Sequence, residues 1–290
     1  MFSQKVIEWT KANGQEVTDP EEELFELYTK FYGFKSTDRE EFTDPSAEEL
    51  DISIDGLSTP ITIHQNTNIN SILSQTGGVV WDCSVIMSRF LCGLSKTGSW
   101  PFDEAQGIEL GCGCGLVGIA LHKLGTKRII LTDQQKLLRL AKLNVETNTR
   151  VGPGSGESAR SSKRTTKKKS HSMESKSNRE VETPIGVIEL EWGTPINVGN
   201  ICNGEPLDFV VISDCVYSED VVTLLLSTLS QLAMARQDGA KTIFIIGQEL
   251  RSEIVHEAFV SNLLKSFCMY RLSIDSKIDS YFALYVAWKR

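Results

Sequence analysis

Short apolar segments alternate with amphipathic stretches along the chain from residue 107 to its end. Short apolar runs bounded by turn residues are typical of buried strands, and helically spaced apolar positions are typical of helices. The predicted strands cover residues 107–110, 128–132, 186–191, 208–213, 241–246, 269–274 and 281–288. The predicted helices cover residues 116–124, 135–148, 219–235 and 252–266. This pattern predicts an α/β fold with a doubly wound, mostly parallel sheet of seven strands, whose last strand returns antiparallel as a hairpin.

The first part of the chain has a different pattern. Residues 1–59 are acidic and poor in strand signals, so they predict an N-terminal extension, and residues 60–290 predict the main domain. A helix is predicted from Pro20, because acids fill its first turn and apolar residues repeat along one side. These apolar residues are Leu24, Leu27, Tyr28 and Phe31. Such a stripe usually packs in a core, and a partner-binding helix is the alternative. Residues 60–65 alternate as a strand, and a further helix is predicted from Asp82.

Residues 151–183 interrupt the alternation of strands and helices. They are rich in Gly, Ser and Lys and have no apolar period, which predicts a disordered insertion. This segment carries eight Lys/Arg and four Asp/Glu, whereas the whole chain has a net charge of −8, so the remaining residues carry −12. A body this acidic disfavours nucleic-acid phosphates and favours a basic partner surface. The basic run is a candidate nuclear-import or phosphorylation segment, and a solvated loop without such a role is the alternative.

The overall composition is that of a soluble globular protein. The N-terminus lacks a signal-peptide pattern, and no apolar run is long enough to span a membrane. The seven cysteines are scattered and odd in number, so we expect free thiols in a reducing compartment. Neither the cysteines nor the four histidines have metal-ligand spacing, and we predict no structural metal. We therefore expect a cytoplasmic protein without membrane contact, with the nucleus as a second location.

A glycine-rich turn within residues 107–118 carries the strongest chemical signal in the chain. The sequence Gly-Ile-Glu-Leu-Gly-Cys-Gly-Cys-Gly-Leu-Val-Gly leads from an apolar strand that contains Glu109 into closely spaced glycines. Glycine accepts positive φ and has no Cβ, so such a backbone can approach a ligand closely. The helix that follows adds free N–H groups and a positive dipole end. The segment predicts a cofactor turn, and a tight turn without a ligand is the alternative.

Two classes of cofactor fit this turn. Gly113, Gly115 and Gly118 satisfy the dinucleotide pattern, and Asp133 follows at the distance expected for a ribose contact. The carboxylate of Glu109 would repel a pyrophosphate, however, whereas the methionine part of S-adenosylmethionine carries an ammonium and a sulfonium. The spacing Glu-x-Gly-x-Gly-x-Gly is also usual in methyltransferases. S-adenosylmethionine is therefore the favoured cofactor, and an NAD-dependent oxidoreductase is the alternative.

Other polar and aromatic residues also stand at strand ends or just before helices, where the carboxyl edge of a parallel sheet binds ligands. They lie in Val80-Trp81-Asp82, Leu131-Thr132-Asp133, Glu191-Trp192-Gly193, Ser213-Asp214-Cys215-Val216-Tyr217 and Glu249-Leu250-Arg251. With the glycine turn, this set resembles the seven-β-strand protein-lysine methyltransferases of the Asp-x-x-Tyr type. That family includes enzymes that act on valosin-containing protein, ribosomal proteins and elongation factors. The resemblance covers residues 60–150 and 184–290 and implies a Rossmann-like methyltransferase domain.

The resemblance also implies a role for individual residues. Those implied to bind S-adenosylmethionine are Trp81, Glu109, Gly111, Cys112, Gly113, Asp133, Trp192 and Ser213. Among them, Asp133 would take the ribose hydroxyls, and Trp192 and Ser213 would contact the adenine. Asp214 and Tyr217 are implied to be catalytic, the acid by stabilising positive charge on the substrate nitrogen and the tyrosine by orienting it. The structural alternatives are helix capping for Asp133, and packing without ligand contact for the aromatic residues.

The implied reaction is methylation of a lysine side chain in a protein. Free lysine has a pKa of about 10.4, so the amine must lose a proton before it attacks, and desolvation in a narrow aromatic slot lowers that pKa. The alternatives are methylation of a small-molecule amine and a non-catalytic S-adenosylmethionine-binding interaction protein. Methylation of nucleic acid is disfavoured because Asn/Asp-Pro-Pro-Tyr/Phe does not follow the predicted strand 208–213. We expect a monomer whose partner is a protein substrate, with ribosomal proteins, elongation factors and chaperone-type ATPases as candidates.

Overall fold

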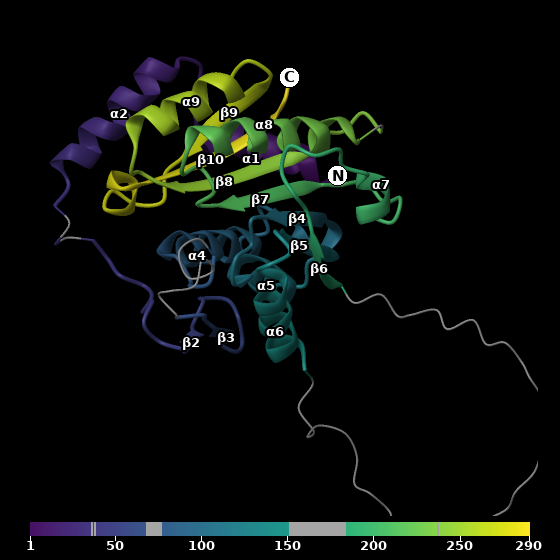
Figure 1. Ribbon diagram of the computed structural model, residues 1–290. Helices are drawn as coiled ribbons and strands as arrows, with labels where there is room; N and C mark the ends of the chain where they lie inside the picture. The colour runs from purple at the N-terminus through teal and green to yellow at the C-terminus, as the bar shows by residue number, and fades with distance from the viewer. Residues whose placement is uncertain (36, 38, 68–76, 151–183, 237) are drawn as a thin grey trace, which may run out of the picture.

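Eight strands form the central sheet in a computed structural model of the chain (Figure 1). The model describes residues 1–35, 37, 39–67, 77–150, 184–236 and 238–290. The strands of the sheet are β1 (Gln15–Val17), β4 (Gln106–Leu110), β5 (Arg128–Asp133), β6 (Ile185–Glu189), β7 (Phe209–Ser213), β8 (Ile243–Glu249), β9 (Phe267–Leu272) and β10 (Phe282–Lys289). Their spatial order is β1-β9-β10-β8-β7-β4-β5-β6. The five strands from β8 to β6 run parallel, whereas β10 is antiparallel to both of its neighbours and β1 is antiparallel to β9.

Helices cover both faces of this sheet (Figure 1). One face is covered by α1 (Phe2–Asn13), α4 (Asp82–Lys96), α5 (Leu116–Lys123) and α6 (Leu138–Thr149). The other is covered by α2 (Pro20–Gly33), the short α7 (Val198–Ile201), α8 (Glu219–Met234) and α9 (Glu253–Leu263). Because strand side chains alternate, Ile243 and Ile245 of β8 enter the first core, and Phe244 and Ile246 enter the second. A central strand buried on both faces explains the continuous apolar run in this part of the sequence.

A second, two-stranded antiparallel sheet pairs β2 (Glu49–Ile52) with β3 (Ile61–His64). Asn144 of α6 fixes it beside the main sheet, because its Oδ1 accepts a hydrogen bond from the backbone N–H of His64 at 2.8 Å. The amide of the same side chain donates to the backbone oxygen of Cys114 at 2.9 Å. One buried asparagine thus ties the small sheet to the glycine turn.

These elements confirm the predicted α/β fold with its doubly wound, mostly parallel sheet and antiparallel C-terminal strand. The sheet has eight strands rather than seven, because β1 of the N-terminal extension adds to the edge strand β9. With three residues, β1 is too short to show an alternating pattern. The extension also contains α1 and β2, and the helix expected over 135–148 begins only at Leu138.

Two of the sequence predictions about organisation are not decided by the fold. The predicted disordered insertion at 151–183 lies outside the described residues. The division into an extension over 1–59 and a main domain over 60–290 stays a prediction. Within the described ranges, no helix is both long enough and apolar enough to cross a membrane.

Candidate active site

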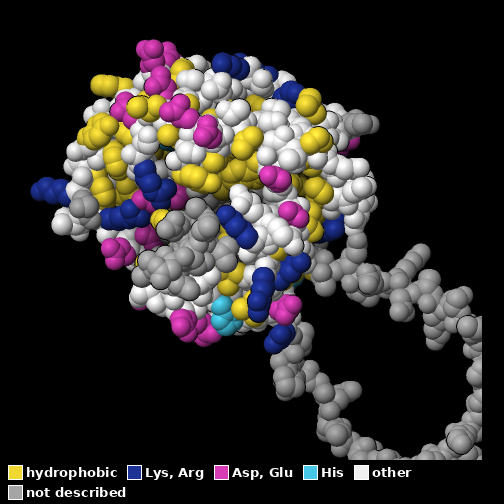
Figure 2. Space-filling view, in the orientation of Figure 1, with side chains coloured by type: hydrophobic (Ala, Val, Ile, Leu, Met, Phe, Trp, Pro, Cys, Tyr) yellow, Lys and Arg dark blue, Asp and Glu magenta, His cyan; other side chains and the backbone are white. Residues whose placement is uncertain are grey.

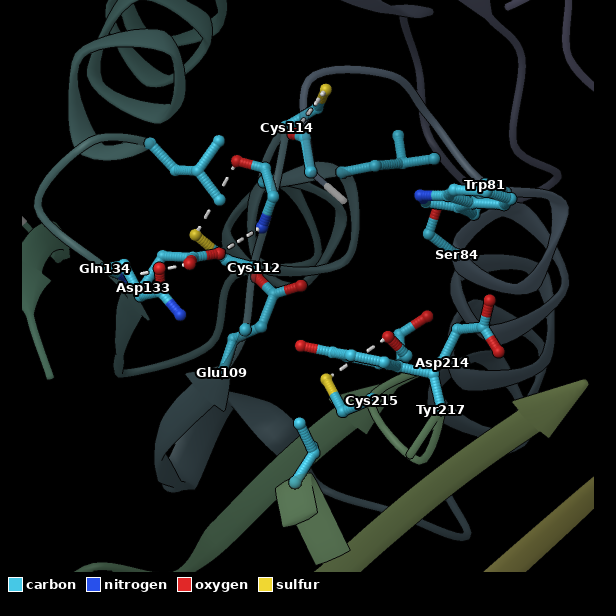
Figure 3. A pocket seen from close by; sticks show the side chains of 18 of the residues that line it. Trp81, Ser84, Glu109, Cys112, Cys114, Asp133, Gln134, Asp214, Cys215 and Tyr217 are labelled. Carbon is cyan, nitrogen blue, oxygen red and sulfur yellow. Dashed lines mark hydrogen bonds between the residues drawn. The ribbon is translucent and has the colours of Figure 1, made fainter. Parts of the chain in front are cut away.

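A pocket of about 400 Å³ opens at the carboxyl edge of the sheet, where β4, β5 and β7 end. All of the site residues predicted from the sequence line it, namely Trp81, Glu109, Gly111, Cys112, Gly113, Asp133, Trp192, Ser213, Asp214 and Tyr217. In Figure 3, side chains from the glycine turn, from the end of β5 and from the loop after β7 face this one space. The fold therefore brings together residues that are distant in the sequence, although their placement alone does not assign their roles.

The turn after β4 presents its backbone to the pocket. Gly111 and Gly113 have φ values of 62° and 52°, a region that residues with a Cβ rarely occupy. A Cβ on Gly111 would come within 2.7 Å of Cys215 Sγ and 3.0 Å of the Trp192 ring. Glycine is therefore required here both for the backbone conformation and for the close approach of Trp192.

Asp133 at the end of β5 is held by the backbone around it. One carboxylate oxygen accepts a hydrogen bond from Gly113 N–H at 2.8 Å, and the other accepts from Gln134 N–H at 2.7 Å. Burial raises the pKa of this carboxyl, and the two backbone donors oppose that effect. Each carboxylate oxygen has a further lone pair, so Asp133 can accept from two hydroxyl groups without losing its anchors.

Glu109 lies deeper, below the glycine turn. Its side chain is 2 % exposed, and Gly118 N–H donates to its Oε2 at 2.9 Å. Burial raises the pKa of Glu109 to about 8, so the carboxyl is mostly protonated at pH 7 in the cofactor-free protein. The prediction that a Glu109 carboxylate repels a pyrophosphate is therefore weakened, since a neutral carboxyl repels little until a cationic ligand favours its ionised form.

Asp214 faces the same pocket from the loop after β7, on the side away from Asp133 (Figure 3). Its φ of 57° is unusual for a residue with a side chain. Arg251 donates to both carboxylate oxygens, at 2.8 Å and 2.7 Å, and Gln248 Nε2 donates to Oδ1 at 3.1 Å. The side chain is 6 % exposed. Asp214 is thus a largely buried, fixed carboxylate at the pocket wall.

Partly exposed aromatic and aliphatic side chains also line the pocket, and hydrophobic side chains gather on the face of the molecule that Figure 2 shows. Tyr217 is 53 % exposed, Leu224 47 % and Trp81 41 %, and all three line the pocket. The guanidinium of Arg251 lies 5.3 Å from the centre of the Trp81 ring, a cation–π arrangement. In Figure 3 the Tyr217 ring extends into the pocket between Asp214 and Glu109. The opening therefore combines apolar walls with one anchored acid, which suits an aliphatic chain that ends in a cationic nitrogen.

The sulfur atoms around the pocket are not candidates for nucleophiles. Burial raises the thiol pKa of Cys83, Cys112 and Cys215 well above the ordinary value, so these groups stay protonated at neutral pH. Ser213 Oγ lies 3.1 Å from Cys83 Sγ, which fixes the hydroxyl expected at the adenine. Among the described residues, no group of His, Cys, Asp and Glu side chains is arranged to hold a metal ion.

Several pocket and support residues received no role from the sequence, although Glu249 stands in the matched stretch Glu249-Leu250-Arg251. The pocket lining that the sequence did not indicate includes Gly77, Ser84, Gln134, Leu137, Val221 and Leu224. Gln248 donates to Asp214, Glu249 accepts from Arg251, and Arg39 in turn donates to Glu249. Gln134 could have been anticipated as the neighbour of Asp133. The others become neighbours of the site only through the tertiary fold.

The doubly wound sheet carries a glycine turn, an acid at the end of the next strand and a fixed acid across the pocket, which fits the class of S-adenosylmethionine-dependent methyltransferases. Residues 58–161 and 164–266 match the family model described as lysine methyltransferase, and the chain belongs to that family. It is an S-adenosylmethionine-dependent protein-lysine methyltransferase, which confirms the predicted family, activity and cofactor. The NAD-dependent alternative is wrong.

Individual relatives agree with this assignment. The chain is 27 % identical over 212 residues to protein N-lysine methyltransferase METTL21A of Mus musculus, covering 73 % of this chain and 77 % of that protein. It is 27 % identical over 243 residues to EEF1A lysine methyltransferase 3 of Xenopus tropicalis, covering 83 % and 87 %. It is 25 % identical over 226 residues to protein-lysine N-methyltransferase EFM6 of Saccharomyces cerevisiae, covering 72 % and 77 %.

Proposed function

We propose that this methyltransferase holds its cofactor against the glycine turn and receives the substrate lysine between Asp214 and Tyr217. The observation that carries the proposal is the anchored Asp214 carboxylate, which lies beside exposed aromatic rings at the mouth of the cofactor pocket. This arrangement gives the two halves of the pocket different chemistry, one for a nucleoside and one for a cation.

The cofactor half fits S-adenosylmethionine in shape and donor set. The glycines let the turn take positive φ values and line the pocket with backbone, Asp133 has acceptor capacity for the ribose hydroxyls, and Trp192 and Ser213 are available to the adenine. Glu109 becomes a counter-charge for the methionine part on losing its proton. When bound, S-adenosylmethionine supplies an activated methyl group on a sulfonium.

The acceptor half must favour a neutral amine before transfer and a cation afterwards. The lysine side chain passes the Trp81 ring and brings its amine between Asp214 and Tyr217, where loss of water lowers the pKa of the amine. Asp214 Oδ1 already accepts from Arg251, Gln248 and the backbone of Glu249, whereas among described residues Oδ2 accepts from Arg251 alone. Oδ2 therefore has capacity for one more donor and stabilises the positive charge that develops on the lysine nitrogen. The remaining contribution is proximity, with no covalent enzyme intermediate.

The partner is a protein with a basic surface, and an elongation factor is our first candidate. Two observations support this choice: the chain outside residues 151–183 is acidic, and the Xenopus tropicalis relative is named as an EEF1A lysine methyltransferase. Ribosomal proteins and chaperone-type ATPases follow. We further propose a cytoplasmic monomer, with the nucleus as a second location.

The Asp214→Ala and Tyr217→Phe variants test the division of roles. With tritiated S-adenosylmethionine and a lysate of cells that lack the enzyme, Asp214→Ala should reduce labelling of the target by about a hundredfold or more. Tyr217→Phe should cost less, because the ring remains. Calorimetry should give a cofactor Kd within about threefold of the wild type for both. If Asp214→Ala abolishes cofactor binding, or if both variants label at the wild-type rate, the acceptor assignment is wrong.

A further inference from the structure

The segment that precedes the family match reaches the active site through Arg39. The family model begins at residue 58, and Arg39 lies in the stretch between α2 and β2. Its guanidinium forms an ion pair with Asp82 at 3.3 Å through Nη2 and a close ion pair with Glu249 through Nη1. Both acids are nearly buried, with side chains 10 % and 8 % exposed. Arg39 therefore bridges the start of α4 and the end of β8.

The same chain segment is anchored at Asp82 by further bonds. The Asp82 carboxylate accepts from Phe42 N–H at 3.1 Å and from Thr43 Oγ1 at 2.9 Å. Asp82 directly follows Trp81, whose ring lies under Arg251. The segment that carries Arg39 is thus fixed next to the wall of the acceptor opening.

Arg39 extends a row of alternating charges that ends at the proposed acceptor carboxylate. The row is Asp82, Arg39, Glu249, Arg251 and Asp214, and each member contacts the next. Three acids and two arginines leave one negative charge, which a single lysine or methyl-lysine cation balances. Removal of the Arg39 charge would leave two.

Glu249 is the point at which Arg39 can influence Asp214. A single nitrogen of Arg251, Nη2, donates to Asp214 Oδ2 and to Glu249 Oε2, each at 2.7 Å. The two acids therefore compete for one donor. While Arg39 holds the other oxygen of Glu249, part of the Glu249 charge is neutralised, and Arg251 keeps its two-point contact with Asp214.

We propose that Arg39 is a positioning residue for methyl transfer: it neutralises Glu249, so that Arg251 holds the Asp214 carboxylate toward the substrate nitrogen. The inference rests on the proposed role of Asp214. It makes the N-terminal segment a part of the acceptor site rather than an appendage to it.

Arg39→Gln tests this proposal, and Arg89→Gln is its matched control. Arg89 of α4 packs its guanidinium 4.6 Å from the centre of the Phe42 ring, against the segment that carries Arg39 but outside the row of charges. Arg39→Gln should lower the rate of target labelling at saturating cofactor by about tenfold and leave the cofactor Kd within about twofold. Arg39→Lys should recover most of the rate, and Arg89→Gln should label like the wild type.

A second variant separates positioning from simple support of the fold. In a Glu249→Gln background the competition for Arg251 is weakened, so adding Arg39→Gln should change the rate less than it does in the wild type. The inference is overturned if Arg39→Gln has its full effect in the Glu249→Gln background. It is also overturned if Arg39→Gln alone labels the target at the rate of Arg89→Gln, or if a thermal scan shows that Arg39→Gln is not folded. If Asp214→Ala is fully active, the proposed function itself fails, whatever Arg39→Gln does.

Discussion

Asp133 at the end of β5 accepts a hydrogen bond of 2.8 Å from the backbone N–H of Gly113 in the turn after β4. The bond joins neighbouring parallel strands at the edge where the pocket opens. The acid that is proposed to hold the ribose therefore also fixes the turn that is proposed to face the rest of the cofactor. A change at Asp133 affects both contacts together.

Asp133→Asn should weaken S-adenosylmethionine binding by about tenfold or more. The amide can present its oxygen to only one of Gly113 N–H and Gln134 N–H, and its NH₂ then faces the other donor. Titration calorimetry checks the change in Kd. Glu189→Gln is the control, because Glu189 is the exposed residue opposite Asp133 in the register of β5 and β6. Equal affinities of the two variants would contradict the ribose assignment.

Gly111→Ala should abolish measurable cofactor binding and destabilise the fold. The added methyl group meets Cys215 and Trp192, and the backbone must also keep a positive φ. Gly204→Ala has the backbone strain without the collision, since φ is 77° and no atom lies within 4 Å of the added Cβ. Gly204→Ala should therefore lose about 1 kcal/mol of unfolding free energy and bind the cofactor normally. If Gly111→Ala binds the cofactor with wild-type affinity, cofactor binding does not need the Trp192 ring at its present position.

Much of the fold was predictable because the alternation of strands and helices is local in the sequence. The missed elements lack that local signal. In α1 the buried positions are Phe2, Ser3, Val6 and Thr10, so two polar residues interrupt the apolar stripe. β2 contains two acids in four residues, and only its pairing with β3 makes it a strand. Such elements depend on tertiary partners that no short window of sequence contains.

The site divides in the same way. The cofactor half was predictable, because the glycine turn and Asp133 lie on consecutive strands and keep a regular spacing. Of the residues proposed for the acceptor half, Asp214, Tyr217 and the stretch Glu249-Leu250-Arg251 were indicated by family resemblance. Gln248 and Glu249 reach Asp214 from β8 and Arg251 reaches it from the loop before α9, whereas Arg39 of the N-terminal segment contacts Glu249. Ion pairs between such distant segments leave no periodicity in the sequence.

The protonation of Glu109 should make the cofactor-free protein less stable as the pH rises. Its pKa is about 8 in the folded protein against an ordinary value of 4.5, so the folded state retains a proton that the unfolded chain releases. The stability that the retained proton contributes is complete below pH 4.5 and is lost as the pH rises through 8. Glu109→Gln resembles the protonated acid and should be more stable than the wild type by roughly 4 kcal/mol at pH 8, but not at pH 4.5. Urea unfolding at both values tests this, and equal differences at the two pH values would refute it.

His256 should make the folded protein less stable as the pH falls, the opposite of the effect of Glu109. Burial lowers its pKa from 6.5 to about 4, and its Nε2 lies 2.8 Å from the hydroxyl of Tyr285, which itself donates to Glu23. The unfolded chain takes up a proton first, so stability present above pH 6.5 is lost as the pH falls toward 4. The expected loss is roughly 3 kcal/mol. His256→Gln should remove this part of the pH dependence in thermal unfolding, and an unchanged profile would count against it.

The pairing of β1 with β9 constrains the order in which the edge of the sheet can form during synthesis. Gln15 stands opposite Arg271, and the two side chains are joined at 2.7 Å across 256 positions of sequence. A ribosome makes β1 well before it makes β9. The edge of the sheet that β1 forms must therefore wait for β9. Closure of this edge of the sheet is therefore a long-range step that cannot precede the synthesis of β9.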